Sequence, residues 1–529
     1  MTQADAMTSA ATDLRSAEVV RAVDGLAIEG HVDEAISLVH RALTDAALAP
    51  VTAAVLRLRL SSMLFMTDRA GDAVAEGESV LAQAHLPEDL YGAAELACLL
   101  ALVAEGDVDG AREHAQTVLG GGGPGSDAGL AGALCALAVR AKDEGRLGDA
   151  LALRQAAVQR ADRLPPEARR NQHPRLGLID DLIALGRFDE ALRAMARVRN
   201  EIELTADPVW AAATAIAGAR LHLATGRLAE AQAEAAAALS TAETLGARIF
   251  AAQAHMVLAS VALVGGDLPL AERHLGLAHP RQRPTWVEVR LAVARCGPRQ
   301  AADLVGAVCD RLIAHRRLLV DEPGAAAWLV RATLAVGDRR RAEAVAACAE
   351  LLAIGNPDFP SLAAVASHAR GVLRADVESL RNAAAGHRDP WARASAHEDA
   401  GVALADVGRQ ADSRAALDDA LAIYARMGAG RDHARVCQRL SDLHRHRGGH
   451  DASAVSGWAS LTNSERRVAH VVAEGLTNAN AAERLFLSRY TIDFHLRQIF
   501  RKLGIRSRVG LTRIVVDRSA MNQAGSASG

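Results

Sequence analysis

The sequence predicts an all-α protein, an α-solenoid of helix pairs followed by a separate short domain of helices. Of its 529 residues 50% are hydrophobic and only 3% aromatic, and this Ala-rich composition is typical of helices that pack closely in thin, repeated cores. A Gly-to-Ala motif recurs about every 40 residues, a period found in helical-repeat proteins. Near the end of the chain, helix caps, apolar residues at helical spacing and basic side chains coincide.

The repeat occupies residues 18–452. Residues 1–17 before it are polar and without periodicity and are expected to form a disordered tail. The unit is an apolar helix, a Gly turn and a second helix with Ala five residues after the Gly. The clear pairs are Gly30 and Ala35, Gly106 and Ala111, Gly145 and Ala150, Gly186 and Ala191, Gly226 and Ala231, Gly266 and Ala271, and Gly337 and Ala342. Weaker copies lie around Ala73, Gly297, Ala375, Gly408 and Gly448.

The Gly and the Ala of this motif each have a physical purpose. Gly adopts the left-handed conformation that ends one helix, and the small Ala lets two antiparallel helices approach, so that each pair can bury its open face on the next pair. The motif resembles the tetratricopeptide repeat, although its Ala-to-Ala spacings of 38 to 41 exceed that family's period of about 34 and the signature aromatics are mostly missing. The resemblance implies a tetratricopeptide-like α-solenoid. A candidate joint lies near 280–285, where HPRQRPT interrupts the spacing.

The segment 461–508 is divided by its caps into three short helices. The expected caps and terminators are, in chain order, a capping box of Thr462 and Glu465, then Gly475, Thr477, Ser488 and Gly504. In the third helix Ile492, Leu496, Ile499 and Leu503 form one apolar stripe, and the opposite face is basic and aromatic. Residues 461–518 hold 11 Lys and Arg against 5 Asp and Glu, a net charge of +6 in a chain of net charge −3. The pattern predicts a helix-turn-helix whose recognition helix faces a phosphate backbone.

Several blocks of this segment, LT-x-x-E, AEGLTN, AERLFLS, T-I-x-x-H and IFRKLGIRSR, resemble the DNA-binding domain of LuxR-type transcriptional regulators. The resemblance implies a four-helix domain over 457–518, followed by a disordered tail at 519–529. It further implies a cytoplasmic, sequence-specific DNA-binding bacterial transcriptional regulator, with the helical-repeat region as a sensing or partner-binding arm. The effector of such an arm would be a protein, a peptide or a small molecule, because a solenoid groove accepts each of them.

The resemblance also assigns roles to individual residues. DNA base contacts fall to Tyr490, Asp493, Phe494 and Arg497, phosphate contacts to Thr477, Asn478, Thr491, His495, Arg501 and Lys502, and dimerisation to Leu511, Ile514 and Val515. The Arg497 guanidinium suits a bidentate contact with guanine. A homodimer would read double-stranded DNA at an inverted repeat in a promoter.

Three positions depart from the family's pattern. Asp493 stands where a basic residue is usual, and Asn480 and Ala481 replace the usual Glu and a larger aliphatic residue. An acidic group in the groove repels phosphate, and the other two changes weaken the cap and the packing of the second helix. The alternative function is therefore a protein-interaction scaffold with a vestigial helix-turn-helix.

Other motifs in the chain do not support an enzyme or a metalloprotein. The segment Gly120–Ser126 is rich in Gly but lacks the Lys of a phosphate-binding loop, and it indicates a linker. His444, His446 and His450 with Asp451 alternate with Arg and indicate a solvated face rather than a metal site. The six cysteines are scattered singly and are expected to be buried, and no run of about 18 uncharged apolar residues is recognised. We therefore expect no catalytic residue, metal, cofactor or membrane span.

Overall fold

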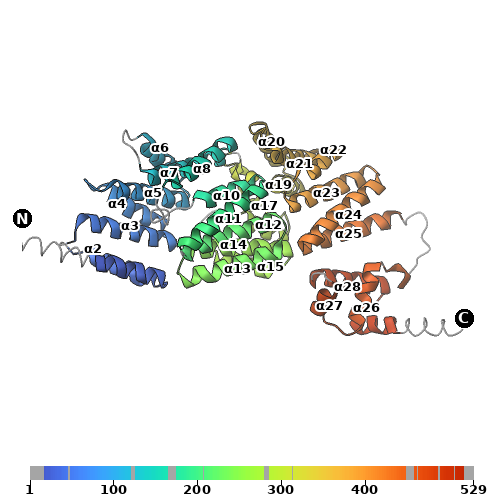
Figure 1. Ribbon diagram of the computed structural model, residues 1–529. Coiled ribbons are helices and arrows are strands. Elements are labelled where there is room, and N and C mark those ends of the chain that lie inside the picture. Colours follow the sequence, from blue (N-terminus) through green and yellow to red (C-terminus); the bar gives the residue numbers. More distant parts are fainter. Residues whose placement is uncertain are drawn as a thin grey trace, which may run out of the picture.

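The computed structural model of the protein describes residues 17–45, 48–120, 126–164, 174–205, 208–278, 285–312, 314–447, 458–461, 463–485, 489–505 and 507–516. The regular elements in these ranges are all helices, as the sequence predicts. Figure 1 shows successive helix pairs crossing the molecule from the N-terminal end, with the C-terminal helices as a small group below the last pairs. The predictions for residues 1–16, 279–284 and 519–529 fall outside the described residues, as do the side chains of the predicted histidine cluster.

The solenoid is a succession of antiparallel helices joined by short turns. After a first helix at 17–28 come α2 (Val32–Leu43), α3 (Pro50–Met66), α4 (Ala70–Leu81), α5 (Glu88–Glu105), α6 (Val108–Gly120), α7 (Asp127–Asp143), α8 (Leu147–Ala161), α10 (Pro174–Ala184), α11 (Phe188–Thr205), α12 (Pro208–Ala224), α13 (Leu228–Thr244), α14 (Arg248–Gly265), α15 (Leu268–Leu277), α16 (Trp286–Cys296), α17 (Ala302–Leu312), α18 (Arg317–Asp321), α19 (Ala325–Ala335), α20 (Arg339–Ile354), α21 (Pro360–Arg374), α22 (Val377–Gly386), α23 (Pro390–Asp406), α24 (Gln410–Met427) and α25 (Gly430–Arg447). The terminal domain consists of η2 (Trp458–Ser460), α26 (Asn463–Ala473), α27 (Asn478–Leu485), α28 (Arg489–Leu503) and a last helix at 508–516.

The predicted repeat is confirmed by the backbone of its turns. All seven motif glycines take the left-handed conformation, with φ between +71° and +96°. The Ala five residues later is buried in each clear copy, because it meets the neighbouring helix. Two weaker copies have another residue where the motif has Gly. These residues, Asp68 and Ala375, still adopt the left-handed conformation, with φ values of +65° and +54°.

The later half of the solenoid packs against the turns of the earlier half. Leu182 of α10 belongs to the same buried core as Leu352 of α20. At the contact, Asn356 Nδ2 donates to the Gly145 carbonyl at 2.7 Å, and its Oδ1 accepts from the Leu147 amide at 2.9 Å. Gly145 is close enough that an added Cβ would lie 2.8 Å from Leu352 Cδ1. The candidate joint near 280–285 therefore does not divide the packed core into two independent arms.

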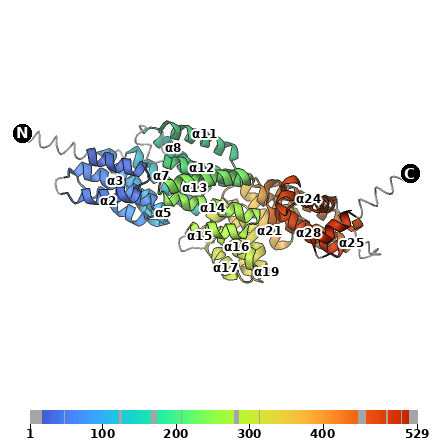
Figure 2. The ribbon, with the colours of Figure 1, turned by 90° about the horizontal axis from the view of Figure 1, so that it is seen from below.

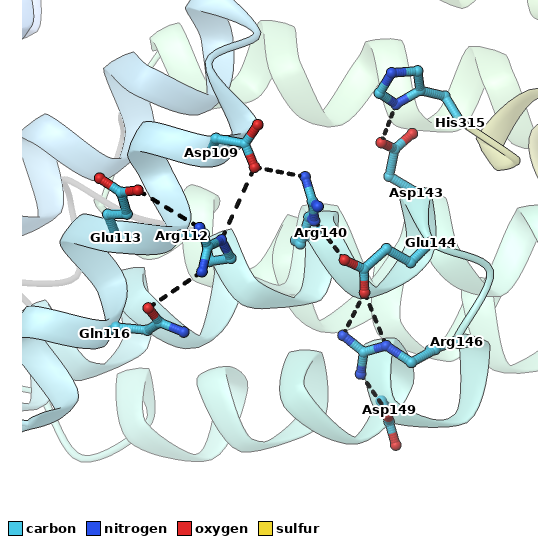
Figure 3. A network of polar contacts seen from close by, with 10 residues as sticks. All are labelled: Asp109, Arg112, Glu113, Gln116, Arg140, Asp143, Glu144, Arg146, Asp149 and His315. Carbon is cyan, nitrogen blue, oxygen red and sulfur yellow. Dashed lines mark hydrogen bonds and ion pairs between the residues drawn. The ribbon is translucent and has the colours of Figure 1, made fainter. Parts of the chain in front are cut away.

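A surface network of ion pairs connects consecutive helices of the earlier half (Figure 3). Arg140 of α7 reaches Asp109 of α6 at 2.9 Å and Glu144 at 2.6 Å. His315 Nδ1 lies 2.5 Å from Asp143 Oδ2, across 172 positions of the sequence. Exposed pairs of this kind contribute only about 0–1 kcal/mol each, so the network orients the helices more than it stabilises them.

One helix approaches the composition of a membrane span. The segment Arg248–Gly265, which is α14, is long and apolar enough to cross a membrane by length and composition, although Arg248, Gln253 and His255 interrupt its apolar character. This helix is packed between neighbouring helices, and over half of the apolar segment is buried, as expected of a core helix (Figure 2). The expectation that all six cysteines are buried needs correction: Cys98, Cys309 and Cys348 are buried, Cys135 and Cys437 are half-buried, and Cys296, at the end of α16, is exposed.

Candidate nucleic-acid interface

The terminal helices form a small domain around one apolar core. The stripe predicted for α28 is confirmed, with Ile492 and Ile499 fully buried, Leu496 nearly so and Leu503 half-buried against them. Val468, Val472 and Ala481 contribute to the same core from α26 and α27. The small Ala481 is therefore accommodated by close approach of α27 rather than leaving the helix loose.

The predicted helix caps and terminators of this domain are confirmed wherever the structure describes them. Gly475 and Gly504 have φ values of +92° and +68°, directly after α26 and α28. Thr477 Oγ1 accepts from the Asn480 amide at 3.2 Å and so caps α27. This contact supplies a cap that does not need the family's usual Glu at position 480. Thr462 and Ser488, the other two expected caps, are outside the described residues.

Asp493, the acidic departure on α28, has partners within the domain. Its carboxylate accepts a hydrogen bond from the side-chain amide of Asn478, at the start of α27. The side-chain oxygen of Asn478, Oδ1, in turn accepts from Arg508 Nη1 at 3.0 Å. Arg508 also donates to the backbone carbonyl of Leu476. The chain Asp493–Asn478–Arg508 therefore ties α28, α27 and the last helix together, and two residues predicted to contact DNA hold the domain's shape.

Two further predicted phosphate contacts are engaged inside the domain. Lys502 Nζ donates to both carboxylate oxygens of Glu465, at 2.8 and 2.6 Å. Because Glu465 is only 6% exposed at its side chain, this pair fastens α28 to α26. Arg501 is exposed and donates to the Gln498 side chain. Lys502 thus has a partner inside the domain, whereas Arg501 lies at the surface.

Arg497 is the predicted base-contacting side chain that the structure shows at the surface. It projects from α28 on the side away from the apolar core, and no ion pair or hydrogen bond to it is found in the described ranges. The side chains of Tyr490, Thr491 and Phe494 lie outside the described part of the chain. The structure thus presents a long helix with a buried stripe and an unpaired guanidinium on the opposite face.

The dimerisation residues predicted on the last helix are mostly internal. Leu511 is fully buried and Val515 is 7% exposed, both in the core of the domain, and Ile514 is half-buried. Leu511 and Val515 therefore lack the exposure that a contact between two copies requires. The apolar side chains that this helix exposes are Val509 and Val516, at 79% and 58%. They are seven residues apart and so share one face.

One flank of α28 lies against α25, the last helix of the solenoid (Figures 1 and 2). Gln498 Nε2 donates to Gln438 Oε1 at 3.3 Å, and Gln498 is only 9% exposed. Burial, and then the charge of His495 on α28, lowers the pKa of His433 on α25 to about 4. Burial also lowers the pKa of His495. Both imidazoles are therefore neutral near pH 7, which suits a closely packed contact.

The fold and the site define a helical-repeat protein that ends in a helix-turn-helix domain of the DNA-binding kind. Residues 459–515 match the family model described as "Bacterial regulatory proteins, luxR family". The terminal domain is accordingly a LuxR-type helix-turn-helix domain, as the sequence motifs predict.

Relatives agree over the same short segment. An HTH-type transcriptional regulator of Mycobacterium bovis is 51% identical over 55 residues, which is 10% of this chain and 6% of the relative. The nitrate/nitrite response regulator protein NarP of Escherichia coli is 44% identical over 52 residues, which is 10% of this chain and 24% of the relative. The chain thus spans only a small part of the length of these relatives.

A comparison with solved structures matches another helical protein at a low level of similarity. The crystal structure of the APC/C hetero-tetramer Cut9-Hcn1 covers 83% of this chain and 92% of its own, at 12% identity and a TM-score of 0.33. The repeat architecture rests on this chain's own glycine turns and helix packing.

Sequence reasoning missed two features of the interface. The sequence indicates only a positive charge for Arg508. In the structure Arg508 lies at the start of the last helix and donates hydrogen bonds to Asn478 and to the Leu476 carbonyl, in the turn before α27. Gln498 was given no role, and its contact with Gln438 joins residues 60 positions apart. No local pattern indicates such a contact, because both side chains are ordinary polar residues on helix surfaces.

Proposed function

We propose that the protein is a bacterial transcriptional regulator that binds double-stranded DNA sequence-specifically through α28. The observation that carries this proposal is the unpaired Arg497 on the surface of α28, opposite its buried stripe. A helix of 15 residues is about 22 Å long and about 10–12 Å wide, which fits the major groove. Arg497 would then meet the edge of a guanine, and Tyr490 and Phe494 are the further base-contact candidates.

The contacts of Asp493 favour a working domain over a vestigial one. The Asp493 carboxylate accepts a hydrogen bond from the Asn478 side chain, which Arg508 holds in turn, so the acidic group has a structural partner within the domain. Asp493 therefore helps to hold α28 in place, and its presence on this helix does not by itself indicate a vestigial domain. The scaffold alternative would need the α28 surface for a protein partner instead.

Binding to DNA is tested by its dependence on salt. The full-length protein should shift random duplex DNA in a gel, and its affinity should fall about a hundredfold between 50 and 200 mM salt if four phosphates are contacted. Of the remaining phosphate candidates Thr477, Thr491, His495 and Arg501, Arg501 carries a permanent charge, so a dependence of this size also requires other arginines of the domain or a second protomer. An affinity that is flat over this range would contradict a phosphate-backbone interface and favour the scaffold.

We also propose that the solenoid is an arm that controls the DNA-binding domain. The support is the packing of α25 on the flank of α28 that carries His495 and Gln498. When a helix enters the major groove, its flanks lie beside the phosphate ridges, so α25 occupies the place of one ridge. α25 is itself held by the solenoid, because Trp391 Nε1 donates to Asp432 at 2.8 Å. Binding to DNA would therefore require α25 and α28 to separate.

Acidification should loosen this contact. His433 and His495 resist protonation while they are packed together, whereas free imidazole protonates near pH 6.5. The packed state is thus fully favoured above about pH 6.5 and loses stability as the pH falls toward 4. The neighbouring charged groups, Glu465 and Lys502, form an ion pair with each other. We expect the affinity of the full-length protein for DNA to rise about tenfold from pH 7.5 to pH 5.5.

The comparison variant for this effect is His433→Gln. It keeps a polar group on α25 but removes its titration, while His495 remains able to gain charge near a phosphate in both proteins. The variant should show a clearly smaller rise, measured by fluorescence anisotropy on one duplex. The same rise in both proteins would remove the support for an inhibitory contact.

Dimerisation is a further proposal, now placed on Val509 and Val516 rather than on Leu511 and Val515. Two exposed valines on one helix face suit a symmetric contact between two copies. Such a homodimer would present two copies of α28 to an inverted repeat. We propose the cytoplasm as its location, since its DNA is there, and a role without catalysis. No group of metal-binding side chains occurs in the described ranges.

A further inference from the structure

A cavity with mostly apolar walls lies between the earlier and later halves of the solenoid. It has a volume of about 360 Å³, and its apolar lining includes Leu223, Met256, Val257, Trp286 and Trp391. These side chains come from α12, α14, α16 and α23. Cavities of about 300–1,000 Å³ with walls of this kind are the usual sites for small ligands.

The charged side chains of this lining are matched within the protein. The ion pairs are those of Lys142 and Arg317 with Asp321, and of Arg220 with Asp180. Asp389 accepts a hydrogen bond from the Ala392 amide at 2.7 Å as the N-cap of α23, and Glu322 interacts with the Trp286 side chain. The Arg290 guanidinium lies 4.5 Å from the ring centre of Trp391. These matches favour a neutral ligand over a charged one.

A chain of hydrogen bonds runs through the core to the wall of this cavity. It begins at Arg331 of α19, which donates to Asp399 of α23. Asp399 Oδ2 lies 2.9 Å from Nε2 of His368 on α21, and His368 Nδ1 lies 3.1 Å from Nε2 of His387, directly after α22. His368 is fully buried, whereas His387, at 2% exposed, lines the cavity. The chain therefore ends at the cavity wall.

The proton positions in this chain follow from its charged end. Burial alone would raise the pKa of Asp399, but Arg331 and then His368 lower it to about 2, so the carboxylate only accepts hydrogen bonds. His368 must therefore donate through Nε2. Burial lowers the pKa of both histidines, so near pH 7 each is neutral and has a single N–H. His368 Nδ1 is then an acceptor, and His387 must donate to it through Nε2.

The other nitrogen of His387, Nδ1, is left with its lone pair unused. The described part of the chain offers this nitrogen no donor, and the nitrogen is not sealed from solvent. It cannot become a donor in the neutral ring unless Nε2 loses its proton and the bond to His368 breaks. The cavity wall thus carries a hydrogen-bond acceptor of fixed polarity among apolar side chains, where a hydrogen bond is stronger than in water.

We propose that this cavity binds a small, neutral, apolar molecule with an N–H or O–H group that donates a hydrogen bond to His387 Nδ1. The apolar body of the ligand would pack among Met256, Trp286 and Trp391. A ligand whose polar atom only accepts would be rejected, because two lone pairs would face each other. His368 and Asp399 are positioning residues. The proposal rests on the sensing arm of the proposed function and names the chemical class of its effector.

The test is isothermal titration calorimetry of the full-length protein near pH 7 with indole and with benzofuran. The two molecules have almost the same shape, but indole has an N–H donor where benzofuran has an oxygen acceptor. We expect indole to bind with a Kd below about 1 mM, and benzofuran to bind at least about tenfold more weakly. Equal affinities for the two molecules, or no binding of indole at about 1 mM, would overturn the proposal.

The first protein variant is His387→Phe, which keeps an aromatic ring at the wall and removes the acceptor. It should weaken indole binding about tenfold and abolish the preference for indole over benzofuran. Its matched control is His397→Phe, because His397 is a half-buried histidine on α23 that faces Asp419 and not the cavity. The control should bind both molecules as the unchanged protein does.

The second variant, Met256→Trp, places the ligand. His387 also lines a neighbouring groove, but Met256 lines the cavity alone, so a larger side chain there should abolish indole binding. If either variant melted like the control and still bound indole as the unchanged protein does, the proposal would fail. The preference between the two molecules is measured on the unchanged protein and decides the matter even if a variant does not fold. Because these measurements contain no DNA, such a failure would leave the DNA-binding proposal standing.

Discussion

Replacing Lys142 with Met is expected to lower the free energy of unfolding of the solenoid by about 3 kcal/mol. The Lys142 side chain is 7% exposed, and its Nζ lies 3.0 Å from Asp181 and 2.7 Å from Asp321. Burial alone would raise the pKa of Asp321, but Lys142 and Arg317 hold it below its usual range. Met fills the volume of the Lys stem and removes only the charge. The buried Asp181 and the half-buried Asp321 would then keep one arginine partner each and lose the shared ammonium.

Arg146→Met is the matched control for this stability change. Arg146 also forms two ion pairs, with Glu144 and Asp149, but it is 52% exposed on the surface of the same region. Its loss should cost at most about 1 kcal/mol. Urea unfolding followed by circular dichroism measures both variants. Equal midpoints would mean that the buried Lys142 contact contributes no more than a surface pair.

Replacing Arg497 with Ala should weaken binding to the specific DNA site about 5- to 150-fold, the range expected for one bidentate base contact of about 1–3 kcal/mol. It should also remove the preference for guanine at one position of each half-site. The physical reason is that Arg497 is the unpaired guanidinium on the outer face of α28. Mobility shift on a panel of duplexes with single base changes would measure both effects.

Arg484→Ala separates base recognition from charge. Arg484 lies on α27, is 54% exposed and forms an ion pair with Glu474, so its loss removes the same formal charge. We expect this variant to weaken binding to all duplexes alike and only slightly. If both variants lowered affinity equally, with the base preference unchanged, Arg497 would not be the residue that reads the sequence.

Much of the fold could be predicted because its signals are local. The left-handed Gly and the small Ala of the motif lie within six residues of each other. In all seven clear copies the Gly has a positive φ and the Ala is buried. Even Asp68 and Ala375 could be located, since the surrounding spacing survives the loss of Gly. The apolar stripe of α28 was predictable for the same reason.

Long-range contacts could not be predicted in this way. The Asn356 side chain forms hydrogen bonds with Gly145 and Leu147, which lie more than 200 positions earlier in the chain. No local spacing of residues predicts this contact. The same holds for the cavity lined by Met256, Trp286 and Trp391, whose walls come from helices far apart in the chain. The last helix fails for another reason, because it has more apolar residues than one face can bury. The core selects Leu511 and Val515, and Val509 and Val516 are left outside.

Selection of duplex DNA from a random pool by the full-length protein tests the central claim most directly. The pool should be bound at about 150 mM salt and pH 6, where the contact between α25 and α28 is weakened. We predict enrichment of one motif with two inverted half-sites, each containing a guanine that the Arg497→Ala variant no longer selects. Recovery of unenriched sequence by the folded protein, or the same motif with both proteins, would contradict sequence reading by α28.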